Sequence, residues 1–201
     1  MINNEAGTHS AIKYLIKQGY RKIGIINGCI DRTTGKGRFD GYLRALKEAQ
    51  IPIDEELIKF GDFKEASGYS LAKELIQGEN KPEVIFVANI DMTLGALASI
   101  KELGLKIPDD IGVCGFDDPK WATIMDPPLT TVSQPTYKLG STAAEMLLSK
   151  IDNKKSKTDN KPRIITLDTN FIIRDSTKNI NSSFNNTGNI IKNLISEFIF
   201  L

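Results

Sequence analysis

The sequence contains few of the residues on which disulfide-rich, metal-binding and membrane-spanning proteins depend. Its 201 residues include only two cysteines, Cys29 and Cys114, which stand far apart without a CxxC spacing or a neighbouring histidine. This pattern argues against a disulfide framework and a zinc site, and it fits a reducing cytosol. No apolar run approaches the roughly 18 residues of a membrane span, and the first residues do not resemble a secretory signal. We therefore expect a cytoplasmic protein without a metal or a cofactor.

An excess of charge of one sign is also missing. The 26 lysines and arginines nearly balance the 25 aspartates and glutamates, which leaves a net charge of +1. A surface that holds a nucleic-acid duplex through phosphate contacts usually carries a clear basic excess. The charge balance therefore gives no indication of a surface that binds duplex phosphates.

Residues for nucleophilic catalysis are equally scarce. The only histidine, His9, lies near the start of the first predicted helix, so a nucleophile at a strand end has no base. The glycine-rich stretch 28–37 follows a strand, but six residues separate Gly28 from Gly35-Lys36 where a P-loop has four. Gly37 then stands where the P-loop has serine or threonine. These absences favour a protein that is not an enzyme.

Apolar runs that predict buried strands alternate with amphipathic stretches that predict helices. Predicted helices cover residues 6–19, 37–50, 66–78, 92–104 and 136–151, and predicted strands cover residues 21–28, 56–62, 83–89, 110–116, 130–132, 163–167 and 170–174. This alternation is typical of βαβ units. It predicts an α/β fold, a three-layer sandwich in which helices cover both faces of a parallel sheet.

Polar and aromatic side chains follow the predicted strands, where sheets of this kind bind ligands. Phe63 offers a ring on which a sugar or a base can stack, although packing in the core is an alternative role for it. Asn89 and Asp117 can hydrogen-bond to hydroxyl groups, and Arg38 supplies a planar set of donors. Asp118 adjoins Asp117, and because neighbouring side chains diverge, at most one of the two carboxylates is expected to face a cleft. The set predicts reversible binding of a small polar ligand.

Several segments, in the same order along the chain, resemble the effector-binding domain of LacI/GalR transcriptional regulators. They are GYRKIGIING, RTTGKGRFDGYLRAL, GDFKEASGY, VIFVANIDMTLGAL, GLKIPDDIGVCGFDD, DPPLTTVSQP and LDTNFIIRDST, within residues 1–177. RTTGKGRFDGY is especially similar to the purine-binding members. The resemblance implies a fold like that of the type I periplasmic binding proteins, with two α/β lobes and an effector between them.

The resemblance also implies roles for the residues at the strand ends. Arg38 and Asp117 would be the main polar contacts with the effector, Phe63 would stack on it, and Asn89 would reach it from the next strand end. The usual family pattern has an aspartate directly after this asparagine. Here the carboxylate comes one place later, as Asp91, which is expected to cap the following helix.

Three further residues are implied to lie near the effector. Arg32 and Thr34 occupy positions at which purine-binding members contact their corepressor, and Asn3 occupies a position that is often aspartate in the family. Arg32, Thr34 and Phe63 favour a nucleobase, whereas Asn89 suits a sugar equally well, so the effector stays open between these classes.

Two segments match the surfaces through which family members form dimers. One is helix 92–104, which contains Leu94, and the other is the loop 121–125, which contains Ile124. Leu94 could instead pack against its own sheet, and Trp121 could instead lie over the mouth of the effector cleft, where it would suit a sugar. A homodimer is expected.

The resemblance implies one complete lobe and parts of a second. The complete C-terminal lobe would comprise about residues 20–129 and 161–174, with remnants of the N-terminal lobe at 1–19 and 130–155 and an Asn-rich, then apolar tail at 178–201. The apolar faces of the first helix (Ile12, Leu15) and of helix 136–151 (Met146, Leu147) would then lack their usual partner. We therefore expect weak order or self-association of these segments.

These observations predict the effector-sensing and dimerisation part of a LacI/GalR-type regulator. Operator DNA would be a partner only through a helix-turn-helix headpiece that this chain does not contain. The alternative is the sugar-binding protein of an ABC transporter, which shares the fold but needs a signal peptide. An enzyme on a doubly wound sheet is the third hypothesis.

Overall fold

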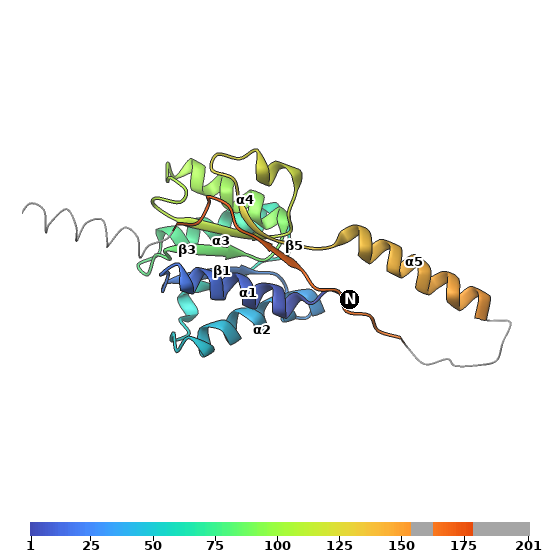
Figure 1. The fold of residues 1–201 in the computed structure, drawn as a ribbon. Helices are drawn as coiled ribbons and strands as arrows, with labels where there is room; N and C mark the ends of the chain where they lie inside the picture. The colour runs from blue at the N-terminus through green and yellow to red at the C-terminus, as the bar shows by residue number, and fades with distance from the viewer. Residues whose placement is uncertain (154–162, 179–201) are drawn as a thin grey trace, which may run out of the picture.

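Residues 1–153 and 163–178 are described in a computed structural model, where they form an α/β fold around one sheet. The strands of the described residues follow the order β2-β1-β3-β4-β5-β6. β1 to β5 run parallel, and β6 pairs antiparallel with β5. The bounds are β1 Ile23–Asn27, β2 Ile58–Phe60, β3 Val84–Val87, β4 Gly112–Phe116, β5 Thr130–Ser133 and β6 Asn170–Ile172. The predicted sandwich with a mostly parallel sheet is confirmed (Figure 1).

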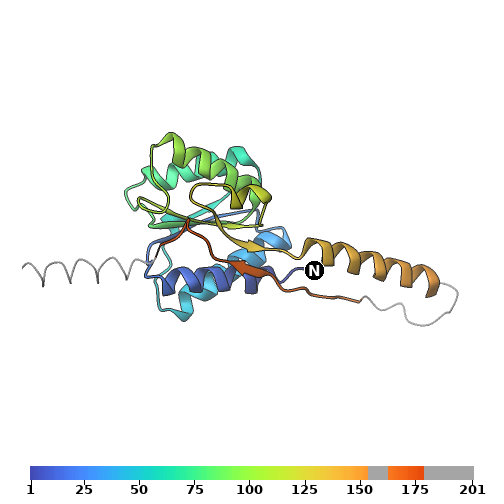
Figure 2. The ribbon, with the colours of Figure 1, turned by 45° about the horizontal axis from the view of Figure 1, so that its top comes forward.

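Helices cover both faces of this sheet. α1 and α2 lie together on one face and α3 and α4 on the other (Figure 2). The bounds are α1 Asn4–Lys17, α2 Thr33–Glu48, α3 Glu65–Gln77 and α4 Ile90–Glu102, with short 3-10 helices η1 Glu55–Leu57 and η2 Lys120–Thr123. Every residue of β1, β3 and β4 is buried, as expected for strands covered on both sides.

The first helix corrects one of the expectations above. Ala11, Ile12 and Leu15 of α1 are fully buried, and α1 packs against α2, β5 and β6. The prediction that this apolar face lacks a partner is therefore wrong, since α1 packs on the sheet that contains both β1 and β5. An amphipathic pattern shows that a helix buries one face, but it does not show which sheet covers that face.

The last described helix behaves differently. α5, Thr136–Asn153, projects away from the sheet (Figures 1 and 2), and its Leu147, Leu148 and Ile151 side chains are 56–60% exposed. Of the two residues predicted to lack a partner, Leu147 is exposed, whereas Met146 is half-buried and lines a hollow together with Ile165. Residues 163–167, predicted as a strand, form only an isolated bridge between Leu167 and Ile2. The predicted tail lies outside the described residues from residue 179 onward.

Candidate functional site

A small pocket lies at the carboxyl edge of the sheet, beyond β1 and β2. We call it the strand-end pocket. It has a volume of about 290 Å³ and is lined by Cys29, Arg32, Thr34, Arg38, Asp62 and Phe63. Because β1 and β2 are parallel neighbours, the loops that follow them meet at one edge. Four of the residues predicted to bind an effector, Arg32, Thr34, Arg38 and Phe63, therefore share one hollow.

Arg38 is held almost completely inside the protein. Its side chain lies on the second turn of α2 and is 4% exposed. Nε donates to Asn4 Oδ1 at 2.9 Å, Nη1 donates to the Ala88 carbonyl, and the guanidinium carbon lies 3.7 Å from the centre of the Phe116 ring. Burial lowers the pKa of Arg38 to about 10, and the nearby charge of Asp117 opposes this shift. Arg38 therefore remains protonated at neutral pH and offers a fixed positive charge.

Asp117 follows β4 in a conformation that only glycine adopts without strain. Its φ angle is +83°, which costs a non-glycine residue roughly 1–3 kcal/mol. Its N–H donates to the Val132 carbonyl at 2.8 Å, and Gln134 Nε2 donates to its carboxylate. Asp117 does not line the strand-end pocket, but its charge acts on Arg38.

Asp118 has a different role from its neighbour. Both of its carboxylate oxygens accept hydrogen bonds from Arg174, at 2.7 and 3.1 Å. These bonds hold the pKa of the Asp118 carboxyl below its usual range. The ion pair joins the end of β4 to the segment after β6, so the predicted divergence of Asp117 and Asp118 is confirmed.

Phe63 places its ring in the strand-end pocket from the loop after β2. Its backbone also lies in the left-handed region, with φ at +67°. The ring packs directly on Gly28, where a Cβ atom would lie only 1.9 Å from a ring carbon. Any side chain at Gly28 would therefore displace the ring. The Phe63 side chain is half-buried, so packing in the core, its alternative role, accounts for only part of the ring's surface.

Two predicted residues bind parts of the protein instead of lining the pocket. Asn89 caps α4, since its Oδ1 accepts from the Met92 N–H at 3.1 Å, and the expectation that Asp91 is the cap is wrong. Asn3 caps α1 in the same way. Neither residue lines the strand-end pocket. A polar side chain next to a strand or helix end is suited to a ligand or to a helix cap, and the local backbone decides between them.

Sequence reasoning missed several residues of this region. Cys29 and Asp62 line the pocket, while Asn4 and Gln134 bond to the two charged candidates, Arg38 and Asp117. Like the other candidates, Gln134 is a polar residue that directly follows a parallel strand. It was missed because the predicted strand stopped at residue 132, whereas β5 ends at residue 133.

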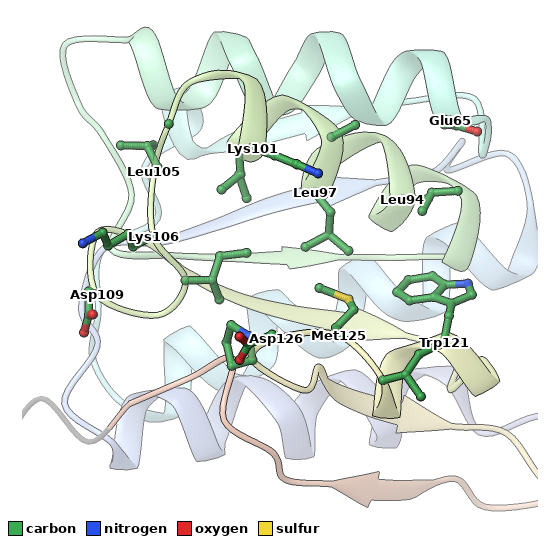
Figure 3. Close-up of a pocket in the computed structure, with 16 residues that line it drawn as sticks. Glu65, Leu94, Leu97, Lys101, Leu105, Lys106, Asp109, Trp121, Met125 and Asp126 are labelled. Atoms are coloured by element: carbon green, nitrogen blue, oxygen red, sulfur yellow. The ribbon is translucent and has the colours of Figure 1, made fainter.

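A second and larger hollow lies between α4 and the segment that contains η2. We call it the apolar groove. It has a volume of about 1060 Å³, and Figure 3 shows Leu94 and Leu97 of α4 beside Trp121 and Met125. Leu94 is 43% and Ile124 83% exposed, so Leu94 does not pack into its own sheet. Trp121, predicted to bind the effector, lies with the predicted dimer residues and not in the strand-end pocket.

Comparison with known proteins agrees with this architecture. Residues 12–177 match the family described as the periplasmic binding protein-like domain. The transcriptional repressor PurR of Photorhabdus laumondii is 44% identical over 149 residues, and that of Yersinia pestis strain Pestoides F is 43% identical over the same length. The chain is a periplasmic binding protein-like domain of the LacI family. The relatives named here are transcriptional regulators and not enzymes.

Solved structures extend the likeness to the whole described fold. A complex of the regulator CelR with cellobiose has a TM-score of 0.80 at 34% identity, over 87% of this chain and 52% of that chain. The repressor ascG of Escherichia coli has a TM-score of 0.74 at 28% identity, over 89% of this chain and 63% of that chain. The chain spans 44% of the length of the curated PurR relatives, aligning over 74% of its own residues. Within residues 1–153 and 163–178, no helix is both long and apolar enough to cross a membrane.

Proposed function

We propose that this domain binds a small-molecule effector, a purine base or a sugar, at the strand-end pocket. The observation that carries the proposal is the meeting of Phe63, Arg32, Thr34 and Arg38 in one hollow at the carboxyl edge of the sheet. The ring can stack on the apolar face of a base or a sugar, and the arginines and the threonine can donate to oxygen and nitrogen acceptors. Asp117, close enough to act on Arg38, would accept from a hydroxyl or amino group.

The size of the pocket supports a ligand that is only partly enclosed. Its volume of about 290 Å³ lies at the lower end of the range for small-molecule sites. A regulator of this family encloses its effector between two lobes, and the strand-end pocket would be the wall that one lobe supplies. We therefore propose that this domain, which supplies one wall, binds the effector far more weakly on its own than two lobes together do.

The apolar groove would serve dimerisation, the second part of the proposed function. The exposed Leu94 and Ile124 and the half-buried Trp121 form an apolar surface that suits a second copy of the chain. In the proposed homodimer, effector binding shifts the lobes, and a headpiece elsewhere in the regulator passes this change to operator DNA. A regulator of this kind works in the cytoplasm. The relatives described above are regulators, which favours this role over that of a transporter's sugar-binding protein.

A titration with matched variants tests the effector proposal. Guanine and cellobiose, each followed by calorimetry and ligand-observed NMR, represent the two ligand classes. Arg32→Ala removes an exposed charged donor from the pocket and is expected to weaken binding about tenfold. Lys36→Ala removes the same charge from α2 outside the pocket and is expected to leave the affinity unchanged. Equal effects of the two variants, or no saturable binding of either ligand, would count against the proposal.

A further inference from the structure

Asn89 is bonded to the protein through both ends of its side chain. Its Oδ1 accepts from the Met92 N–H at 3.1 Å, and its Nδ2 donates to the Phe63 carbonyl at 3.0 Å. The residue is 9% exposed. The amide that resemblance implies as an effector contact therefore has its acceptor and one donor hydrogen committed to α4 and to the loop after β2.

The Phe63 backbone needs an external partner to keep its conformation. With φ at +67°, the residue lies in a region that phenylalanine seldom adopts, and such residues persist where surrounding contacts hold them. Asn89 Nδ2 supplies a hydrogen bond to the carbonyl of this residue. Gly28 leaves room for the Phe63 ring. A Cβ atom added at this glycine would lie within 2.5 Å of three ring carbons, so any other residue would displace the ring.

We propose that Asn89 is a positioning residue of the effector site, which fixes the Phe63 backbone through its carbonyl and thereby holds the ring against Gly28. α4 begins at Ile90, so the cap and the ring position depend on the same side chain. The proposal rests on the proposed function only for its effect on binding, since the ring position is a property of the free protein. Asn89 then influences effector affinity without touching the effector.

Asn89→Asp is the variant that separates the two bonds. Aspartate is as good a helix cap as asparagine, so the bond to Met92 is kept, but it cannot donate to the Phe63 carbonyl. Gln77→Glu adds the same negative charge at the exposed far end of α3 and serves as the control. Asn89→Ser, which also caps, is the second variant if the aspartate variant does not fold, as judged by circular dichroism and its thermal transition.

The first readout needs no ligand. The chain is labelled with 4-fluorophenylalanine, and the resonance of Phe63 is assigned by its loss in Phe63→Leu. Asn89→Asp is expected to shift and broaden this resonance, while Gln77→Glu leaves it in place. An unchanged Phe63 resonance in a folded Asn89 variant would overturn the proposal, whether or not any effector binds.

The second readout is a double-mutant cycle measured with guanine and cellobiose. Asn89→Asp is expected to weaken binding about tenfold in the natural sequence. It should weaken binding less than about twofold in the Phe63→Ala background, because the residue it positions is gone. Equal losses in both backgrounds would show a direct contact between Asn89 and the effector and would overturn the proposal. If the natural chain binds neither ligand, the proposed function fails, and the fluorine resonance alone decides the positioning role.

Discussion

The strand-end pocket and the apolar groove differ in volume, in the chemistry of their lining residues and in the backbone conformation beside them. The groove is the larger, at about 1060 Å³ against about 290 Å³, and its lining includes Leu94, Leu97 and Trp121. The pocket is lined by the Phe63 ring, two arginines, a threonine, a cysteine and an aspartate. Two of the residues at this edge, Phe63 and Asp117, have left-handed backbones. Volume alone would place a ligand in the groove.

On this comparison we propose that the chemistry of the lining residues, and not the volume, distinguishes the ligand site from the protein-binding surface. Strained backbone persists only where neighbouring bonds hold it, and it gathers at sites that bind ligands. An open apolar surface with exposed leucine and isoleucine side chains gains most from burial against another protein.

Leu94→Asp is expected to abolish dimerisation without affecting the pocket. In a symmetric dimer it would bury an unpaired charge on both copies, which we expect to cost about 4 kcal/mol, or roughly 1000-fold in the dissociation constant. Sedimentation equilibrium measures the change. Ile53→Asp, at a 53% exposed site outside the groove, is the control. A dimer that survives Leu94→Asp, or one that Ile53→Asp disrupts equally, would contradict the assignment of the groove.

Phe63→Ala is expected to act only on the pocket. Loss of a stacking ring costs about 2 kcal/mol, or roughly 30-fold in effector affinity. Phe60→Ala is the matched control, because Phe60 is 48% exposed at the end of the same strand and packs on Phe39, outside the pocket. Calorimetry compares the two variants, and the dimerisation constant should be the same in both. A larger loss from Phe60→Ala would place the ligand elsewhere.

Changing the pH between 6 and 9 is expected to have the smallest effect. The pKa of Arg38 is lowered to about 10, so its charged form persists through this interval and binding through it weakens only as the pH rises through 10. Burial of the charged Arg38 side chain lowers the stability of the folded protein at pH values below 10. This destabilisation decreases as the pH rises above 10, because the pKa of Arg38 in the folded protein lies below its ordinary value. Effector affinity should change less than about twofold between pH 6 and 9. The measurement uses cellobiose, which does not ionise in this interval, and the double variant His9→Gln/Cys29→Ser, which removes the only histidine and the thiol in the pocket. A loss of binding centred below pH 9 in that variant would contradict a protonated Arg38 at the site.

The helix and sheet layers of the fold, and the meeting of Arg38 and Phe63 at one edge of the sheet, could be predicted from the sequence. Alternating apolar and amphipathic segments predict the parallel strands, and the carboxyl ends of these strands bring Arg38 and Phe63 together. The partner of α1 could not be predicted, because an amphipathic pattern does not name the sheet that it faces. Trp121 follows β4 in a long loop, and only the path of that loop decides whether the indole reaches the pocket or the groove. The role of Asn89 depends on the left-handed backbone of Phe63, which no sequence pattern there predicts.

A single titration followed by two-dimensional NMR tests the division between the two hollows most directly. Guanine and cellobiose are each added to the ¹⁵N-labelled chain while the backbone amides of Gly28 and Phe63 and the indole N–H of Trp121 are observed together. We predict saturable shifts at Gly28 and Phe63 for at least one of the two ligands, with the Trp121 indole unmoved. Saturable shifts at Trp121 with Gly28 and Phe63 unmoved would place the ligand in the apolar groove and contradict the account.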